Sequence, residues 1–395
     1  MTKTVLLTLG CAMTALSAFA QDGFTITGKF PGLKAGSKVE LVNADGREQK
    51  NWYKIDGAVE RDGEFVIKGS VEMPMLCEVR ISPLDGSAVD GVNDRLFPLM
   101  VENVAIETSA AHIDSVPPSF YFGTSGLYQL KNVTVKGGEA QKEYEQYQAA
   151  MFPYDIAARQ AHYNLYIDEN RDKSDEGKAR LKEAYDAANK AQVEADENFI
   201  SEHPAYHISM LRWGQKLSAP FQYSNDELDA IWAKVSGNNS PARVAKVKAV
   251  IDKARKFVRG QQYADFPALD PEGKEGRFSD QLGKDRYTMV DFWASWCGPC
   301  RMAIPHVREL HEKYGDRLGI VAVSVDEDPE AWKLAMEQEK MTWPQMRVAK
   351  ENFKDVTSAY NFSGIPFIVL IDPQGRIAFA GHDPVKASEI LSKVL

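Results

Sequence analysis

Cysteine is scarce in this sequence, with four in 395 residues. So small a number excludes a fold held together by several disulfides, because each disulfide uses two cysteines. Basic residues are also in the minority: 47 Lys and Arg face 56 Asp and Glu, which gives a net charge of −9. We therefore expect no nucleic-acid partner, since a phosphate backbone is bound by clustered Lys and Arg.

Long apolar runs are missing after the first twenty residues, so no later segment is predicted to cross a membrane. The first twenty residues combine Lys3, an apolar stretch and small residues at Ala18 and Ala20, in the arrangement that a signal peptidase cuts. An N-terminal anchor helix is the alternative, but the apolar stretch is short for a span of about 20 residues. We therefore expect a signal peptide, 1–20, cleaved after Ala20, and an exported, periplasmic protein.

The rest of the chain divides into three predicted domains. Residues 21–137 alternate apolar and polar side chains in short segments separated by turns, which predicts a small antiparallel β domain, either a sandwich or a barrel. Residues 138–262 are rich in Ala, Glu, Lys and Gln, which predicts a helical connecting domain. Residues 263–395 alternate strand and helix patterns, which predicts an α/β domain with helices on the faces of a central sheet.

The segment VDFWASWCGPC in the last domain holds two of the cysteines. Cys297 follows a predicted strand that ends near Ala294, and a predicted helix runs on from Cys300. The Cys297 sulfur is therefore expected at a helix N-terminus, where free backbone N–H groups and the helix dipole favour a thiolate. Cys297 is the predicted attacking sulfur and Cys300 the more buried, resolving thiol. Gly298 and Pro299 fit a tight turn into the helix, and the arrangement predicts reversible dithiol-disulfide exchange.

Two further positions support this chemistry. Asp291 lies in the apolar strand before the motif, where burial raises the proton affinity of a carboxylate, and it is expected to take up the Cys300 proton. A purely structural buried acid is the alternative. Ile365-Pro366 opens a later strand, and a cis bond there would present backbone to an extended substrate segment. The expected substrate-binding residues are Trp296, Gly298, Pro299, Ile365 and Pro366.

These motifs resemble the thioredoxin superfamily. The resemblance rests on VDFWASWCGPC, on a following helix that contains Pro305, and on the downstream SGIPF. An inserted helix between Asp326 and Gly364, and a leading segment DFPALDPEGKEGRFSDQLGKDRYTMV, are similar to the exported thiol-disulfide oxidoreductases of the TlpA/ResA type, often grouped with the AhpC/TSA family. The resemblance covers residues 263–395, about a third of the chain.

This resemblance implies a thioredoxin-like fold and assigns site roles. Cys297 would be the nucleophile, Cys300 the resolving thiol, Asp291 the buried acid and Pro366 the cis-proline beside the active site. One departure is that the lysine partner of the buried acid in thioredoxin has no match in GIVAVSVDED. In the β domain, RDGEFVIKGSVEMP resembles the DUF4369 domains that precede such modules, and this likeness implies no activity.

Other uses of the cysteine pair are less well supported. A thiol peroxidase would carry a Pro-x-x-x-Thr-x-x-Cys pattern, which DFWASW before Cys297 does not match. A zinc site formed by the pair with His306 and His311 has too short a gap between its ligand pairs, and a copper chaperone usually has a third ligand. A further alternative is a non-enzymatic assembly or binding protein in which the pair forms a structural disulfide, although a disulfide that closes so small a ring stabilises little.

Two isolated features have ordinary explanations. His203 and His207 have the spacing of a helical metal pair, but Pro204 disfavours a helix at His203 and no third ligand is near. Cys77 lies in the strand-like MPMLCEVRIS, as either a buried inert thiol or a regulatory one.

The direction of exchange is inferred from the resemblance. Gly-Pro between the cysteines is the thioredoxin dipeptide, so we expect a reductase of disulfides in other exported proteins, with an oxidase or isomerase as the alternative. No cofactor is expected beyond the redox-active Cys297–Cys300 disulfide. The resemblance implies disulfide-containing exported client proteins and a membrane thiol-reducing donor of the DsbD/CcdA type. The β and helical domains could supply docking or a homodimer contact.

Overall fold

The computed structural model describes residues 23–43, 54–82, 84, 94–119, 123–219, 221–237, 241–283 and 285–395. The predicted signal peptide, 1–20, lies outside these residues. The chain divides into two compact units, Met1–Ile208 and Ser209–Leu395, and each is described by itself. Within the described ranges, no helix has both the length and the apolar character of a membrane span.

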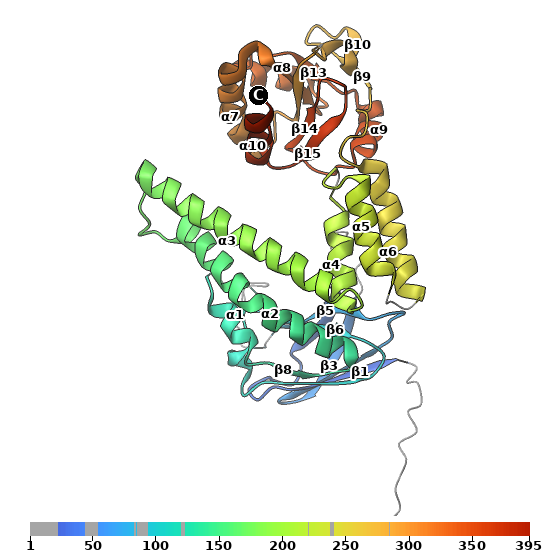
Figure 1. Ribbon diagram of the computed structural model, residues 1–395. Helices are drawn as coiled ribbons and strands as arrows, with labels where there is room; N and C mark the ends of the chain where they lie inside the picture. The colour runs from blue at the N-terminus through green and yellow to red at the C-terminus, as the bar shows by residue number, and fades with distance from the viewer. Residues whose placement is uncertain are drawn as a thin grey trace, which may run out of the picture. The chain divides into compact units, whose positions relative to one another are not determined.

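The first unit contains an eight-stranded sheet (Figure 1) with the order β6-β5-β2-β3-β4-β1-β7-β8. Its neighbouring strands are antiparallel, except that β1 and β7 pair in parallel. Alternate residues of β5 are buried, among them Cys77, as expected for a strand with one face on the core. The predicted β-rich region is confirmed. Its strands are β1 (Phe24–Lys29), β2 (Lys38–Asn43), β3 (Lys54–Arg61), β4 (Glu64–Gly69), β5 (Met75–Ser82), β6 (Arg95–Val101), β7 (Ala105–Ser109) and β8 (Thr134–Lys136).

Two long helices of the first unit run alongside each other (Figure 1). The Glu102 carboxylate, directly after β6, accepts a hydrogen bond from the Ala140 amide at 3.0 Å and so anchors the first turn of α2. Further along, the Tyr147 hydroxyl donates to the buried Asp196 carboxylate at 2.8 Å, which ties α2 to α3. The helices are α1 (Ser125–Leu130), α2 (Glu139–His162), which continues as a π-helical turn (Tyr163–Ile167), and α3 (Asp175–Glu202).

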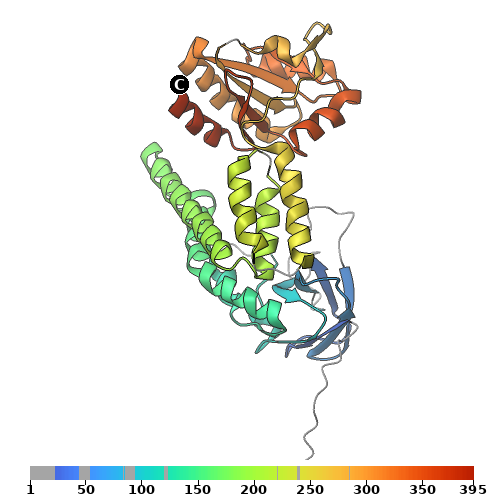
Figure 2. The same cartoon turned by 45° about the vertical axis from the view of Figure 1, so that its right-hand side comes forward.

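Three shorter helices, α4 (His207–Leu217), α5 (Asn225–Ser236) and α6 (Pro241–Ala254), lie side by side in Figures 1 and 2. The predicted helical middle region is therefore confirmed, but its helices are shared between the two compact units. The domain boundaries predicted at 137 and 262 stay a prediction. Ser224 caps α5: its side chain accepts from the Glu227 amide, and the Glu227 carboxylate accepts from the Ser224 amide.

The α/β part of the second unit is built on a sheet with the order β10-β9-β13-β12-β11-β14-β15. The inner strand β11 is parallel to β12 and antiparallel to β14. The predicted α/β architecture is confirmed. Its strands are β9 (Pro267–Leu269), β10 (Glu275–Arg277), β11 (Tyr287–Trp293), β12 (Leu318–Ser324), β13 (Gln345–Arg347), β14 (Phe367–Ile371) and β15 (Ile377–Gly381).

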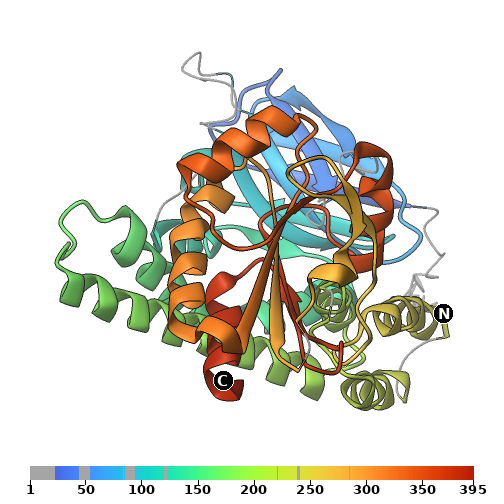
Figure 3. The same ribbon diagram turned by 90° about the horizontal axis from the view of Figure 1, so that it is seen from above.

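Helices cover both faces of this sheet, as Figure 3 shows from above. One apolar core lies between the sheet and α7 (Gly298–Tyr314), α8 (Pro329–Gln338) and α10 (Pro384–Val394). A second core lies on the opposite face, beneath α9 (Lys350–Tyr360). Alternate residues of β11 serve the two cores: Met289 and Trp293 face the first, and Val290 and Phe292 the second.

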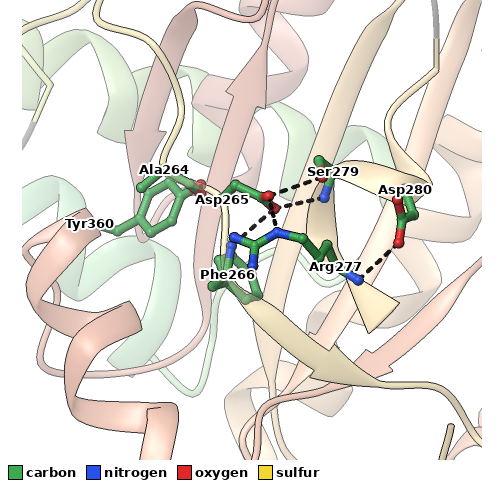
Figure 4. Close-up of polar contacts among 7 residues, drawn as sticks. All are labelled: Ala264, Asp265, Phe266, Arg277, Ser279, Asp280 and Tyr360. Carbon is green, nitrogen blue, oxygen red and sulfur yellow. Dashed lines mark hydrogen bonds and ion pairs between the residues drawn. The ribbon is translucent and has the colours of Figure 1, made fainter. Parts of the chain in front are cut away.

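A polar cluster fixes the segment that enters β9 (Figure 4). The Asp265 carboxylate accepts hydrogen bonds from the Arg277 guanidinium and from Ser279, whose amide lies at 2.9 Å and hydroxyl at 3.0 Å. Nearby, the Tyr360 hydroxyl donates to the Ala264 carbonyl at 2.7 Å. Burial opposes ionisation of Asp265, but the hydrogen bonds from Arg277 and Ser279 outweigh it and lower the pKa of the carboxyl.

Candidate active site

The two cysteines of VDFWASWCGPC form a disulfide at the start of α7. The sulfurs are 2.01 Å apart and the Cα atoms 5.3 Å apart. Cys297 is the N-cap of the helix, and its Sγ accepts a hydrogen bond from the Cys300 amide at 3.2 Å. Both residues are buried, with 5% of Cys297 and 2% of Cys300 exposed, so the N-cap position rather than exposure distinguishes the sulfur predicted to attack. A thiolate on Cys297 would keep this N–H donor and the positive end of the helix dipole.

Exposed residues surround this pair. Trp296 is 69% exposed, and Gly298 and Pro299 are also on the surface. Pro299 lies in the first turn of α7, where its missing N–H leaves no helical hydrogen bond unmade. A side chain at Gly298 would meet open space, so no steric contact at this turn requires glycine. The space beside Gly298 is available to a chain that approaches the turn.

The predicted proline is brought next to the disulfide. The Ile365-Pro366 peptide bond is cis, as predicted, and precedes β14. The Ile365 carbonyl oxygen lies 3.8 Å from the Cys297 sulfur. Ile365 and Pro366 are both partly exposed beside the cysteine, so their backbone is available to a segment that reaches the sulfur.

A histidine missed in the sequence also belongs to this site. His382 follows β15, and its Nδ1 lies 2.7 Å from the Pro366 carbonyl oxygen. Its ring packs edge-on against Phe367, with ring centroids 5.2 Å apart. Pairing of Ile368 with Gly381 brings this end of the hairpin to the cis-proline. Only the register of β14 and β15 reveals the contact, because no local motif surrounds His382.

Asp291 lies beneath the same layer of helices as the cysteines. Side chains alternate along a strand, so Asp291 faces the same core as Met289 and Trp293, the core that also contains Cys300. Its neighbours across the sheet are Ala322 on β12 and Ile368 on β14. Neither neighbour is charged, and burial raises the pKa of the Asp291 carboxyl to about 7. The carboxyl can therefore hold or release a proton near neutral pH.

The structure gives the other candidate ligands different partners. His306 Nε2 lies 2.6 Å from the Ser388 hydroxyl, and His311 packs against Trp343 with ring centroids 5.7 Å apart. In the first unit, His207 pairs with the Glu143 carboxylate, with 2.8 Å from Nδ1 to Oε2. In the part of the chain that the structure describes, no three His, Cys, Asp or Glu side chains gather as a metal site would need.

Comparison with known proteins points to the same segment. Residues 285–377 match the family described as Thioredoxin-like, a match that contains Asp291, both cysteines and Pro366. Residues 24–144 match a domain of unknown function, DUF4369.

Individual relatives align with about a third of the chain. The thiol-disulfide oxidoreductase ResA of Bacillus thuringiensis subsp. konkukian is 30% identical over 126 residues, which are 32% of this chain and 70% of that protein. The thioredoxin-like protein YneN of Bacillus subtilis is 30% identical over 121 residues, 30% of this chain and 68% of that protein. Among solved structures, the thioredoxin domain of a thiol-disulfide oxidoreductase from Bacteroides vulgatus is 29% identical; it covers 35% of this chain and 98% of its own, with a TM-score of 0.33.

Proposed function

Because the chain belongs to the thioredoxin-like thiol-disulfide oxidoreductases of the ResA type, we propose that it reduces disulfides in other exported proteins through Cys297 and Cys300. The observation that carries the proposal is the Cys297–Cys300 disulfide at the start of α7, with the Ile365 carbonyl 3.8 Å from the Cys297 sulfur. The disulfide is itself the redox group, so the reaction needs no further cofactor.

The exchange proceeds in two steps. In the reduced protein the Cys297 thiolate attacks one sulfur of the client disulfide, a mixed disulfide forms and the other client sulfur leaves as a thiolate. The Cys300 thiolate then attacks the Cys297 sulfur, which releases the second client sulfur and closes the Cys297–Cys300 bond. The client gains two electrons and two protons, and the two cysteines lose them.

Asp291 is proposed to accept the Cys300 proton before the second step. A pKa of about 7 lets this carboxyl bind a proton and release it again near neutral pH. Since its sheet neighbours are Ala322 and Ile368, the proton passes without the lysine that thioredoxin places beside its buried acid.

The client is proposed to bind as an extended segment across the exposed rim of the disulfide. Trp296, Gly298 and Pro299 supply one side of this rim, and the backbone of Ile365 and Pro366 supplies the other. The exposed indole of Trp296 offers apolar area for any client sequence, which fits a broad clientele.

The proposal also includes export of the protein and a partner that reduces the Cys297–Cys300 disulfide again after each reaction. The sequence of residues 1–20 supports a signal peptide cleaved after Ala20, and a periplasmic location follows from it. An exported reductase must regain electrons, so a membrane thiol-reducing donor of the DsbD/CcdA type is proposed as its second partner. A homodimer stays a prediction.

The midpoint potential of the Cys297/Cys300 couple tests the direction. A value close to that of thioredoxin, about −270 mV, in glutathione or dithiothreitol buffers would support the reductase direction. A value near that of DsbA, about −120 mV, would reverse the direction and favour an oxidase or isomerase. Cys297→Ser is the control, and a wild-type pair that does not titrate at all would reject the oxidoreductase function.

A further inference from the structure

A buried carboxylate outside the cysteine motif accepts hydrogen bonds from the loop that contains the motif. Asp326 follows β12 and is 2% exposed. One of its oxygens accepts from the Ser295 amide at 2.8 Å and from the Ser324 hydroxyl at 2.8 Å, while the other accepts from the Ser295 hydroxyl at 2.6 Å. A carboxylate removed from water needs such donors, and Ser295 supplies two of the three.

Ser295 belongs to the turn that delivers Cys297 to the helix. The Cys297 amide donates to the Ala294 carbonyl at 3.1 Å, and the Val325 amide donates to the Trp293 carbonyl at 2.9 Å. The turn is thus closed on itself and tied to the end of β12. Because Trp296, the residue between Ser295 and Cys297, is largely exposed, the packing of its own side chain holds the turn weakly.

The geometry at Cys297 depends on this turn. Its sulfur accepts the Cys300 amide at 3.2 Å only while Cys297 stays at the N-cap position of α7. A hydrogen bond to a thiolate stabilises the charged form and lowers the pKa of the thiol. Loosening the turn would lengthen this bond in part of the population, so the fraction of reactive thiolate would fall.

We propose that Asp326 is a positioning residue for thiol-disulfide exchange, which through Ser295 holds the Cys297 sulfur at the N-terminus of α7. The proposal deepens the function proposed above and rests on it. None of the hydrogen bonds described for Asp326 involves a sulfur atom. Asp326 therefore acts through Ser295 and takes no part in forming or breaking disulfide bonds. The role needs both the amide and the hydroxyl of Ser295, since one bond holds the backbone of this residue and the other holds its side chain.

The second unit contains a matched control for this pair. Asp265 likewise accepts from both the amide and the hydroxyl of one serine, Ser279 (Figure 4), at 2.9 Å and 3.0 Å. Its other partners are the Arg277 guanidinium and the Phe266 amide, and neither of them lies in the cysteine loop. Removing either carboxylate should cost stability in a similar way, but only Asp326 should change the behaviour of Cys297.

The test measures alkylation of Cys297 by iodoacetamide as a function of pH, in the reduced full chain, with the modified peptide quantified by mass spectrometry. We expect Ser295→Ala, which changes no charge, to move the midpoint of alkylation upward by about one pH unit, with a rate about tenfold lower at pH 6. Asp326→Asn should also move the midpoint upward, but by less, because it removes a negative charge that disfavours the thiolate. Ser295→Thr, which keeps the hydroxyl, should restore the wild-type profile. Ser279→Ala and Asp265→Asn should leave the profile unchanged.

The other ionisable side chains on the elements around Cys297 stay the same in all these variants. They are Cys300, Arg301 and His306 on α7, Asp291 on β11, His382 after β15, Glu339, which pairs with Arg301, and Arg347, which donates to the Asp326 carbonyl. A shift in Ser295→Ala therefore reports the turn, because no charge changes in this variant, whereas Asp326→Asn combines the loosened turn with the loss of one carboxylate charge. Ser295→Ala, which removes a single bond at a partly exposed position, keeps the test valid if Asp326→Asn does not fold.

The outcomes separate this proposal from the function on which it rests. An unchanged alkylation profile in Ser295→Ala, together with a loss of stability like that of Ser279→Ala, would make Asp326 a structural residue only and overturn the proposal. Alkylation requires no client, so a shifted profile supports the positioning role even if the protein fails to reduce a disulfide substrate. That combination of results would reject the proposed reductase function and leave the positioning role supported.

Discussion

At the residue scale, the different positions of the two sulfurs predict that substituting each cysteine with serine affects the mixed disulfide differently. In Cys300→Ser the attacking Cys297 remains, but no thiol can resolve the mixed disulfide. We expect a covalent adduct with a disulfide protein such as insulin, visible by intact mass, and turnover reduced by at least about 10²-fold. Cys297→Ser should form no adduct. An adduct in Cys297→Ser instead would mean that Cys300 is the attacking thiol.

The buried acid predicts an unusual dependence of stability on pH. The pKa of Asp291 is raised from its ordinary value to about 7, so the folded state binds a proton that the unfolded chain releases near pH 4. Its contribution to stability is present below pH 4 and is lost as the pH rises to 7. Between pH 5 and pH 8 the wild type should lose about 3 kcal/mol of unfolding free energy that Asp291→Asn does not lose.

Asp265, in the same domain, should make stability depend on pH in the opposite direction to Asp291. Its pKa is lowered, because the bonds from Arg277 and Ser279 outweigh its burial, so its contribution is present at neutral pH and is lost on acidification. Denaturant titrations of both Asn variants across pH 3–8 should therefore diverge in opposite directions. If Asp291→Asn follows the wild type over the whole range, the pKa of the Asp291 carboxyl is not raised, and the carboxylate is too weak a base to hold the Cys300 proton near neutral pH.

At the element scale, the cap of α5 is the clearest local determinant. Ser224 and Glu227 satisfy each other's backbone amides, and the Arg259 guanidinium lies 2.9 Å from Glu227. Ser224→Ala should weaken the first turn by about 1 kcal/mol, so amide exchange at Glu227 should accelerate about fivefold. Ser224→Thr, which keeps an acceptor oxygen, is the control. Equal exchange in both variants would show that Arg259, rather than the cap, holds the turn.

Elements with a strong pattern could be predicted from the sequence, and weakly patterned ones could not. Strands β11 and β12 are continuous apolar runs, and Cys297, Gly298 and Pro299 mark the start of α7. β13 was missed because a strand of three residues leaves no clear period. α9 was also missed, although its buried residues Val356 and Tyr360 are four apart and so carry a helical period.

The residues of the site also divide into those that could be predicted from the sequence and those that could not. The cysteines, Asp291 and Pro366 could be found because each lies in a recognisable local motif. His382 and Asp326 could not, since their contacts with Pro366 and Ser295 come from strand pairing between segments distant in sequence. Sequence spacing predicts the reacting groups, and the sheet register determines which residues position them.

At the scale of the whole molecule, the predicted boundary at 262 cuts through bonded structure. The Gly260 amide donates to the Ile377 carbonyl at 2.8 Å, and the Ile377 amide returns a bond to the Gln261 carbonyl at 2.8 Å. Phe221 is 4% exposed and contributes to the core beneath α9. Residues before 263 therefore complete an edge and a core of the thioredoxin-like fold.

This arrangement predicts that fragment 209–395 is more stable than fragment 263–395. Loss of two backbone hydrogen bonds and of the burial of Phe221 should lower the unfolding free energy of the shorter fragment by about 3–5 kcal/mol, measured by urea denaturation. The midpoint potential should be the same in both fragments while they are folded, because the cysteine turn and its contacts lie within residues 263–395. Equal stability would instead support the domain boundary at 262 and make the preceding helices a separate connector, whereas an altered potential would mean that those helices also influence the disulfide.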